Sequence, residues 1–189
     1  MDLQLWDGRP GNTQGREERE VRVYDFLDRL GIAYQRIDHV AADNMEACQA
    51  IDKALQATIC KNLFLCNRQQ TRFYLLMMPD YKNFKTKELS SQIGSARLSF
   101  GPAEKMEEYL DILPGSLSVM GLMNDHEGNV TLLVDEDVLQ GEFVGCHPCV
   151  NTASLKIRTE DVFTTFLKAV GHDYTTVVLH GDRNPMEHA

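Results

Sequence analysis

Two apolar runs in the middle of the chain constrain the fold more than any other feature. They cover residues 63–66 and 72–78, and the polar segment 67–70 separates them. Short apolar runs around a polar turn are typical of a β-hairpin. Pro79 follows the second run and stops that strand, because proline has no backbone N–H to donate. A buried hairpin is therefore expected near the centre of the fold.

Segments with helical periodicity lie on both sides of this hairpin. Helices are predicted at residues 16–30, 86–93 and 160–170, from Pro102 onward, and after a capping box of Asp43 and Glu46. Thr159 is expected to cap the last of them. Further strands are expected at residues 32–37, 96–100, 130–134, 143–146, 153–157 and 175–179. The pattern predicts a single α+β domain with a mixed, twisted β-sheet flanked by helices.

Length and composition fit one domain with a sizeable core. The chain has 189 residues, of which 43% are hydrophobic and 25% charged. We expect a flexible lead-in at residues 1–15, the domain at 16–179 and a loose tail at 180–189. No apolar run approaches the ~20 residues that span a bilayer, and residues 1–20 have no signal-peptide core. A cytoplasmic protein without membrane contact is expected.

Charge limits how the chain could hold nucleic acid. The formal net charge is −9, whereas a protein that grips nucleic acid over its whole surface is usually basic. A nucleic-acid partner would need a local patch, and Lys82, Lys85 and Lys87 form the richest one. The alternative is that these lysines are simply the solvated start of a helix.

Lys61 is the first candidate site residue. It directly precedes an apolar strand, where its ammonium could neutralise a phosphate or a developing oxyanion. Asn62 beside it could orient a substrate amine or a water. The alternative is a lysine that extends its charge to solvent at the strand entrance.

Two further segments supply backbone and polar groups. Residues 114–121, Pro-Gly-Ser-Leu-Ser-Val-Met-Gly, are too rich in glycine and serine for a regular element, and their backbone could approach a ligand closely. A tight crossover loop is the alternative. His147 stands before a proline at a strand entrance, with Asn151 and Thr152 close behind. These could form one polar edge, or His147 could be an ordinary turn residue.

Cys146 and Cys149 form a Cys-x-x-Cys that suggests a rival redox role. Such motifs need the first cysteine exposed at a helix N-terminus, but the residues that follow here are typical of a strand. The cluster offers only three nitrogen or sulfur ligands, so a zinc site is not favoured. The five cysteines are an odd number, which fits a reducing compartment.

Three segments together resemble the YbaK-like aminoacyl-tRNA deacylases, also called the prolyl-tRNA editing domain family. The segments are Cys-Lys-Asn-Leu-Phe-Leu at 60–65, Leu-Pro-Gly-Ser-Leu-Ser-Val-Met-Gly-Leu at 113–122 and His-Pro-Cys-Val-Asn-Thr-Ala-Ser at 147–154. The similarity runs from about residue 20 to residue 170. The chain looks most like the free-standing, PrdX-like branch that edits alanyl-tRNA(Pro).

This resemblance implies a YbaK-like fold with a pocket for the acceptor end of an aminoacyl-tRNA(Pro). It implies hydrolysis of the ester to the terminal ribose, without a metal or other cofactor. Lys61, Gly115 and His147 hold the places of the family's central lysine, loop glycine and pocket histidine. The expected substrate-binding residues are Asn62, Ser118, Met120, Gly121, Asn151 and Thr152.

The sequence departs from the family in two places and leaves alternatives open. Val119 and Met120 replace a common Pro-Phe or Pro-Ile, and Val40 follows His39 where a proline is usual. Both changes bear on amino-acid preference more than on the reaction. The alternatives are a cysteinyl-tRNA(Pro) deacylase and a non-catalytic aminoacyl-tRNA or regulatory binding module. The need for a prolyl-tRNA synthetase partner and the oligomeric state stay open.

Overall fold

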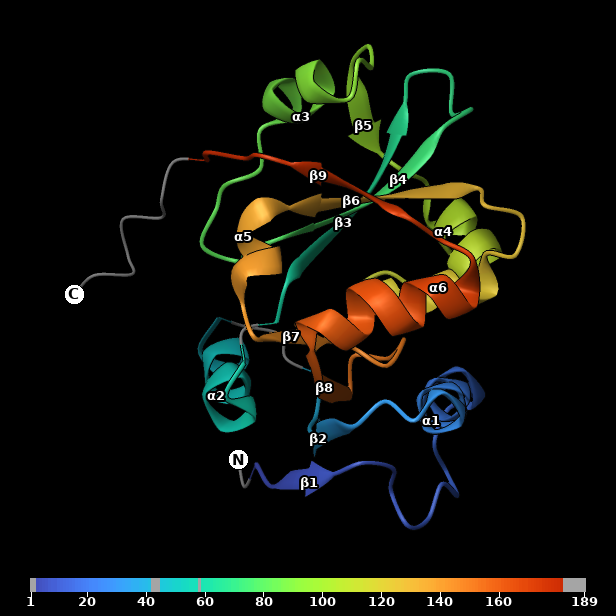
Figure 1. Cartoon of the computed structure of the whole chain (residues 1–189), viewed down its shortest axis with the longest axis vertical. Coiled ribbons are helices and arrows are strands. Elements are labelled where there is room, and N and C mark those ends of the chain that lie inside the picture. Colours follow the sequence, from blue (N-terminus) through green and yellow to red (C-terminus); the bar gives the residue numbers. More distant parts are fainter. Residues whose placement is uncertain (1–2, 42–44, 58, 182–189) are drawn as a thin grey trace, which may run out of the picture.

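The computed structural model describes residues 3–41, 45–57 and 59–181. The α+β class expected from the sequence is confirmed. The described strands form two sheets rather than the one expected, because the chain leaves the first sheet after β2 and returns to it only at β7 and β8. Figure 1 shows the two sheets one above the other, with the helix through η2 and α6 crossing between them in this view.

The five-stranded sheet contains the predicted hairpin. Its order is β5 (Leu98–Phe100), β3 (Lys61–Asn67), β4 (Phe73–Met78), β6 (Val130–Asp135) and β9 (Tyr174–Val177). β3 pairs antiparallel with β4 and β5, whereas β4, β6 and β9 run parallel. The sheet is therefore mixed, and the central position of the hairpin is confirmed.

The four-stranded sheet is antiparallel throughout. Its order is β1 (Leu5–Asp7), β2 (Tyr34–Asp38), β8 (Ala153–Arg158) and β7 (Phe143–Cys146). β1 lies inside the segment expected to be a flexible lead-in, so that expectation is wrong for these residues. The Arg36 guanidinium donates to the Gly8 carbonyl at 2.6 Å and holds the lead-in against the sheet. Three residues are too few for strand alternation to be visible in the sequence.

Helices cover the sheets. They are α1 (Glu18–Leu30), α2 (Met45–Leu55), α3 (Thr86–Gln92), α4 (Ala103–Leu110), η1 (Val119–Asn124), α5 (Glu136–Gln140), η2 (Asp161–Phe166) and α6 (Leu167–Val170). One buried cluster joins both sheets and takes in Val162 and Phe166 of η2. A second cluster lies on the other face of the five-stranded sheet, where Leu89 of α3 packs. No helix within the described ranges has the length and apolar character needed to cross a membrane.

Two local expectations change, and two others fall wholly or partly outside the described residues. The segment 114–121 is not irregular throughout, because Ser118 accepts a hydrogen bond from the Met120 N–H and starts the 3₁₀-helix η1. Thr159 does not cap the last helix, because its hydroxyl donates to the Gly141 carbonyl at 2.5 Å. Asp43 of the capping box lies outside the described residues, as does most of the expected tail, from residue 182 on.

Candidate functional site

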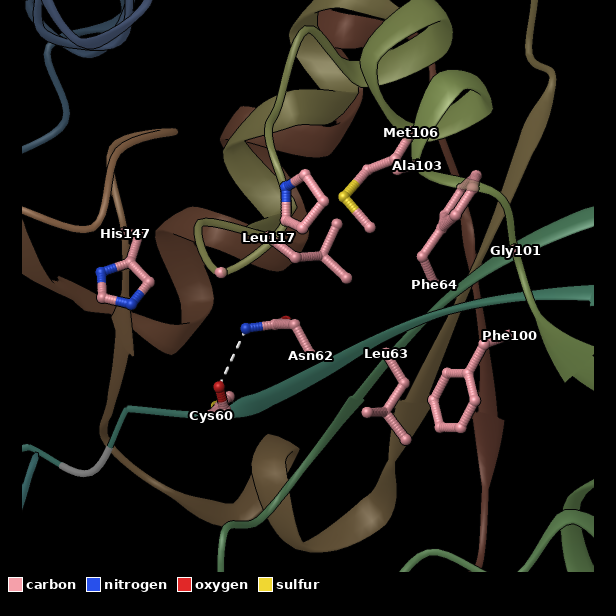
Figure 2. Close-up of a pocket in the computed structure, with 12 residues that line it drawn as sticks. Cys60, Asn62, Leu63, Phe64, Phe100, Gly101, Ala103, Met106, Leu117 and His147 are labelled. Atoms are coloured by element: carbon pink, nitrogen blue, oxygen red, sulfur yellow. Dashed lines mark hydrogen bonds between the residues drawn. The ribbon is translucent and has the colours of Figure 1, made fainter. Parts of the chain in front are cut away.

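A cavity of about 410 Å³ opens where the loop after α4 faces the start of β3 and the turn after β7. Figure 2 shows Asn62 projecting from β3 into the middle of this space, with His147 on one side and Phe64 and Met106 on the other. The wall is mostly apolar. Its lining residues are Cys60, Asn62, Leu63, Phe64, Phe100, Gly101, Ala103, Met106, Pro114, Gly115, Leu117 and His147.

Asn62, which lines the cavity, has an unused acceptor. Its Nδ2 donates to the Cys60 carbonyl at 2.9 Å, the dashed bond in Figure 2. Its Oδ1 is buried and has no hydrogen-bond partner among the described residues. A buried acceptor left unpaired costs about 1–3 kcal/mol, so it indicates a place where a ligand donor would be stabilised.

His147 presents a nitrogen lone pair. Its Nδ1 lies 3.0 Å from the Ala153 carbonyl, which can only accept, so Nδ1 carries the proton and Nε2 of the neutral ring is an acceptor. Burial lowers the pKa of His147, the hydrogen bond to Ala153 opposes this, and the nearby His39 lowers the pKa further. The two imidazole centroids are 6.4 Å apart. The ring is therefore neutral near pH 7 and can accept a proton.

Gly115 supplies a backbone donor at the rim. It adopts φ +91°, a conformation that side-chain-bearing residues rarely adopt. None of the described groups accepts its N–H. A Cβ placed here would lie 3.9 Å from Nδ2 of Asn151, so Asn151 stands beside the loop. Thr152 is exposed and does not line the cavity.

Lys61 does not face the cavity, contrary to its expected place. Neighbouring residues of a strand point to opposite faces, and Asn62 takes the cavity face. The Lys61 ammonium instead donates to the Lys82 carbonyl at 2.8 Å. This bond ties the start of β3 to the loop after β4.

Three residues expected to bind substrate lie behind the cavity instead. Ser118 and Met120 are fully buried and do not line the cavity. Gly121 has a packing role, because a Cβ at this position would approach Cδ1 of Ile112 to 2.5 Å. These residues place the loop by burying the first turn of η1, and they do not contact the cavity themselves.

The expected lysine patch loses one member. Lys82 is 7% exposed, and its Nζ lies 2.8 Å from both Oδ1 of Asp135 and Oδ2 of Asp137. Burial alone would lower the pKa of Lys82, but these two carboxylates outweigh it and raise the pKa. Lys85 and Lys87 are exposed. Lys82 thus belongs to a buried ion-pair network and is not available to a phosphate.

The thiols lie in surroundings that disfavour the reactive thiolate. Cys146 and Cys149 are buried, and burial raises the pKa of both, to about 12 for Cys146. Cys60 lines the cavity, but burial and the nearby Asp80 raise its pKa to about 12 as well. The thiolate is the nucleophile, so none of these cysteines is activated at neutral pH. No group of three or more His, Cys, Asp or Glu in the described chain is arranged to hold a metal ion.

Sequence reasoning missed most of the apolar wall. Phe100 is the last residue of β5, Gly101 follows it, and Met106 comes from α4. Gly101 is required there, because a Cβ would lie 2.5 Å from the ring of Phe64. The only local signal was the glycine and proline pair at 101–102, which we interpreted as a helix start.

The fold matches a solved structure over most of both chains. A crystal structure described as a candidate trans-editing enzyme for prolyl tRNA synthetase superimposes with a TM-score of 0.65 over 86% of this chain and 97% of that one, at 16% identity. This likeness establishes the α+β fold. The family model for the aminoacyl-tRNA editing domain matches residues 39–165. The chain therefore belongs to the aminoacyl-tRNA editing domain family.

Two named relatives are similar to this chain over most of its length. The chain is 30% identical over 153 residues to the prolyl-tRNA editing protein ProX of Acetoanaerobium sticklandii, covering 81% of this chain and 93% of that protein. It is 29% identical over 171 residues to the prolyl-tRNA synthetase associated domain-containing protein 1 of Bos taurus, covering 88% and 98%. The matched segment includes Asn62, Gly115 and His147.

Proposed function

We propose that this protein is a cytoplasmic trans-editing hydrolase that deacylates mischarged aminoacyl-tRNA(Pro), with alanyl-tRNA(Pro) as its preferred substrate. The observation that carries the proposal is the cavity in which Asn62 Oδ1, His147 Nε2 and the Gly115 N–H are all without partners among the described residues. Membership of the editing family and the likeness to a prolyl-tRNA editing protein support an aminoacyl-tRNA as the substrate of this cavity.

The chemistry of proofreading explains why such a cavity is small and mostly apolar. A synthetase pocket built for proline excludes the smaller alanine by only ~1–3 kcal/mol, so a second site must remove the error. Leu63, Phe64, Met106 and Leu117 supply an apolar wall for a small side chain. Asn62 Oδ1 would accept from the substrate ammonium and orient the ester.

The hydrolytic step needs no protein nucleophile. We assign Nε2 of His147 as the acceptor for a proton of the attacking water, whose oxygen bonds to the ester carbonyl carbon. The Gly115 N–H would donate to the carbonyl oxygen as it gains negative charge. The bond from this carbon to the ribose oxygen then breaks, and the ribose oxygen takes the proton from His147. The products are the free amino acid and the tRNA.

Lys61 takes a positioning role in this proposal. It stands between the lining residues Cys60 and Asn62 and anchors the start of β3 through the Lys82 carbonyl. Lys61→Ala should lower both deacylation and the free energy of unfolding, the latter by about 1.5–3 kcal/mol because a charged hydrogen bond is removed. Lys61→Arg should retain most of both. Lost activity with unchanged stability would instead mean that Lys61 acts directly on the substrate.

The deciding experiment follows release of alanine, cysteine and proline from the matching charged tRNA(Pro), with spontaneous hydrolysis subtracted. We expect fast release of alanine and little release of proline. Preferential release of cysteine would favour the cysteinyl-tRNA(Pro) deacylase, and binding without turnover would favour a non-catalytic module. Running the assay with and without prolyl-tRNA synthetase tests whether that partner is needed.

A matched variant addresses the thiol alternative. Cys149→Ser should leave alanine release within about twofold of the wild-type rate, because the thiol is buried and protonated. Loss of alanine release in a variant that remains folded would mean that the Cys149 thiol takes part in the reaction.

A further inference from the structure

Phe100 is the most exposed aromatic side chain among the described large hydrophobic residues, at 68%. It ends β5, an edge strand of the five-stranded sheet, and pairs with Leu65 of β3. Its ring contacts Phe84 edge-on, with centroids 6.4 Å apart. Burial of such a ring is favourable, so a ligand that covered it would be stabilised.

Phe100 is also a shared wall between two cavities. One is the candidate ester site, and the other is a neighbouring cavity of about 550 Å³. In Figure 2 the ring lies beside Leu63 at the far side of the site from His147. The second cavity is lined by Leu65, Phe84, Thr86, Lys87, Ser90, Arg97, Leu98, Ser99 and Phe100. Phe100 therefore connects the first cavity to the second, and a ligand longer than the first cavity could extend across this ring.

The neighbouring cavity combines an apolar floor with a basic rim. Lys87 and Arg97 are both exposed, and no acid in the described part of the chain lines this cavity or forms an ion pair with either of them. In a protein of net charge −9, two unpaired cations beside an exposed aromatic ring form a distinct local feature. Aromatic stacking with flanking cations is how proteins hold single-stranded nucleic acid.

We propose that this second cavity binds the unpaired nucleotides that precede the terminal adenosine of the tRNA, with a base stacked on Phe100 and phosphates held by Lys87 and Arg97. This inference rests on the proposed function, because it places the acylated 3′ end in the first cavity. Compared with the lysine patch expected from the sequence, the proposed subsite contains Arg97 instead of Lys82. It also contains the Phe100 ring as a stacking surface.

The test measures binding separately from hydrolysis. The probes are two uncharged RNA minihelices of the acceptor stem, one with its single-stranded 3′ end and one without it. The wild-type protein should bind the first at least about tenfold more tightly. Phe100→Ala should abolish most of this preference, and Phe100→Trp should keep it, because tryptophan retains a stacking face.

Charge variants complete the test. Lys87→Ala with Arg97→Ala should reduce the slope of log Kd against log salt by about 0.7 for each phosphate that the protein no longer neutralises. Lys53→Ala is the matched control, since Lys53 is an exposed lysine on α2, which packs against the other sheet. Equal binding of both minihelices by the wild type, or an unchanged preference in Phe100→Ala, would overturn the proposal. A protein that prefers the single-stranded end but hydrolyses no charged tRNA would refute the proposed function and leave this subsite standing.

Discussion

At the scale of single residues, the candidate site is defined by groups that folding leaves unused. Asn62, His147 and Gly115 each keep one hydrogen-bonding group free among the described residues, although the side chains of Asn62 and His147 also bond within the chain. An unpaired polar group destabilises the unliganded protein, and a substrate that pairs with it removes this free-energy cost. Activity and stability should therefore respond differently when they are removed.

Asn62→Ala tests this separation. We expect the kcat/KM for alanyl-tRNA(Pro) to fall by at least about tenfold, because the substrate ammonium loses its acceptor. The free energy of unfolding should change by less than about 1 kcal/mol, because removal of the unpaired Oδ1 offsets the missing bond to Cys60. Urea unfolding and single-turnover deacylation would measure the two effects. A large loss of stability would show that Asn62 serves the fold.

His147 should set the acid limit of activity. The step requires the neutral ring, and burial lowers the pKa of His147 below its ordinary 6.5. The midpoint of the acid decline in rate should therefore lie below pH 6.5, because the ring becomes protonated only at lower pH than an ordinary histidine. We would measure kcat/KM between about pH 5 and 8 with uncatalysed hydrolysis subtracted. In His147→Gln the rate should be low and this acid limb absent; an unchanged limb would assign it to another group.

At the scale of elements, the loop after β4 is fixed by a buried charge network. Lys82 bridges Asp135 at the end of β6 and Asp137 in α5, and the Tyr81 hydroxyl donates to Asp137 at 2.8 Å. Asp135 also accepts the Leu179 N–H at 3.0 Å, just beyond β9. The Lys82 carbonyl accepts a hydrogen bond from the Lys61 ammonium. The same network therefore includes Lys61, the first residue of β3, beside the cavity.

Lys82→Met should therefore destabilise the protein strongly. Removing the cation leaves Asp135 buried without its charge partner, which costs about 3–5 kcal/mol. Lys87→Met is the matched control, because Lys87 is an exposed residue of α3. This change should alter the free energy of unfolding by less than about 0.5 kcal/mol. Chemical denaturation of the two variants compares them. Similar stabilities would contradict the buried network.

At the scale of the whole molecule, the net charge of −9 opposes a polyanionic partner. Binding must depend on a few local cations, so affinity for charged tRNA should be modest and sensitive to salt. We expect the KM of deacylation to rise steeply between about 50 and 200 mM salt while kcat changes little, because screening acts on association rather than on the ester step. A KM independent of salt would mean that tRNA is held mainly by uncharged contacts.

The sequence was informative about elements whose causes are local. The β3–β4 hairpin follows from two apolar runs around a polar turn, and α1 ends at Gly31, which adopts φ +66°. Prediction from the sequence failed where a residue far away in the chain determines the local structure. β1 forms because it pairs with the free edge of β2. The Thr159 hydroxyl donates a hydrogen bond to the Gly141 carbonyl rather than capping its own helix.

The same division applies to the site. The sequence by itself determined the α+β class and the segments that hold Asn62, Gly115 and His147, because motif spacing and periodicity are properties of the chain. Only the tertiary structure decided that Lys61 turns away, that Lys82 is buried and that Phe100 joins two cavities. Strand facing, burial and cavity walls depend on contacts between residues far apart in the chain, and those contacts are made only when the sheets and helices pack.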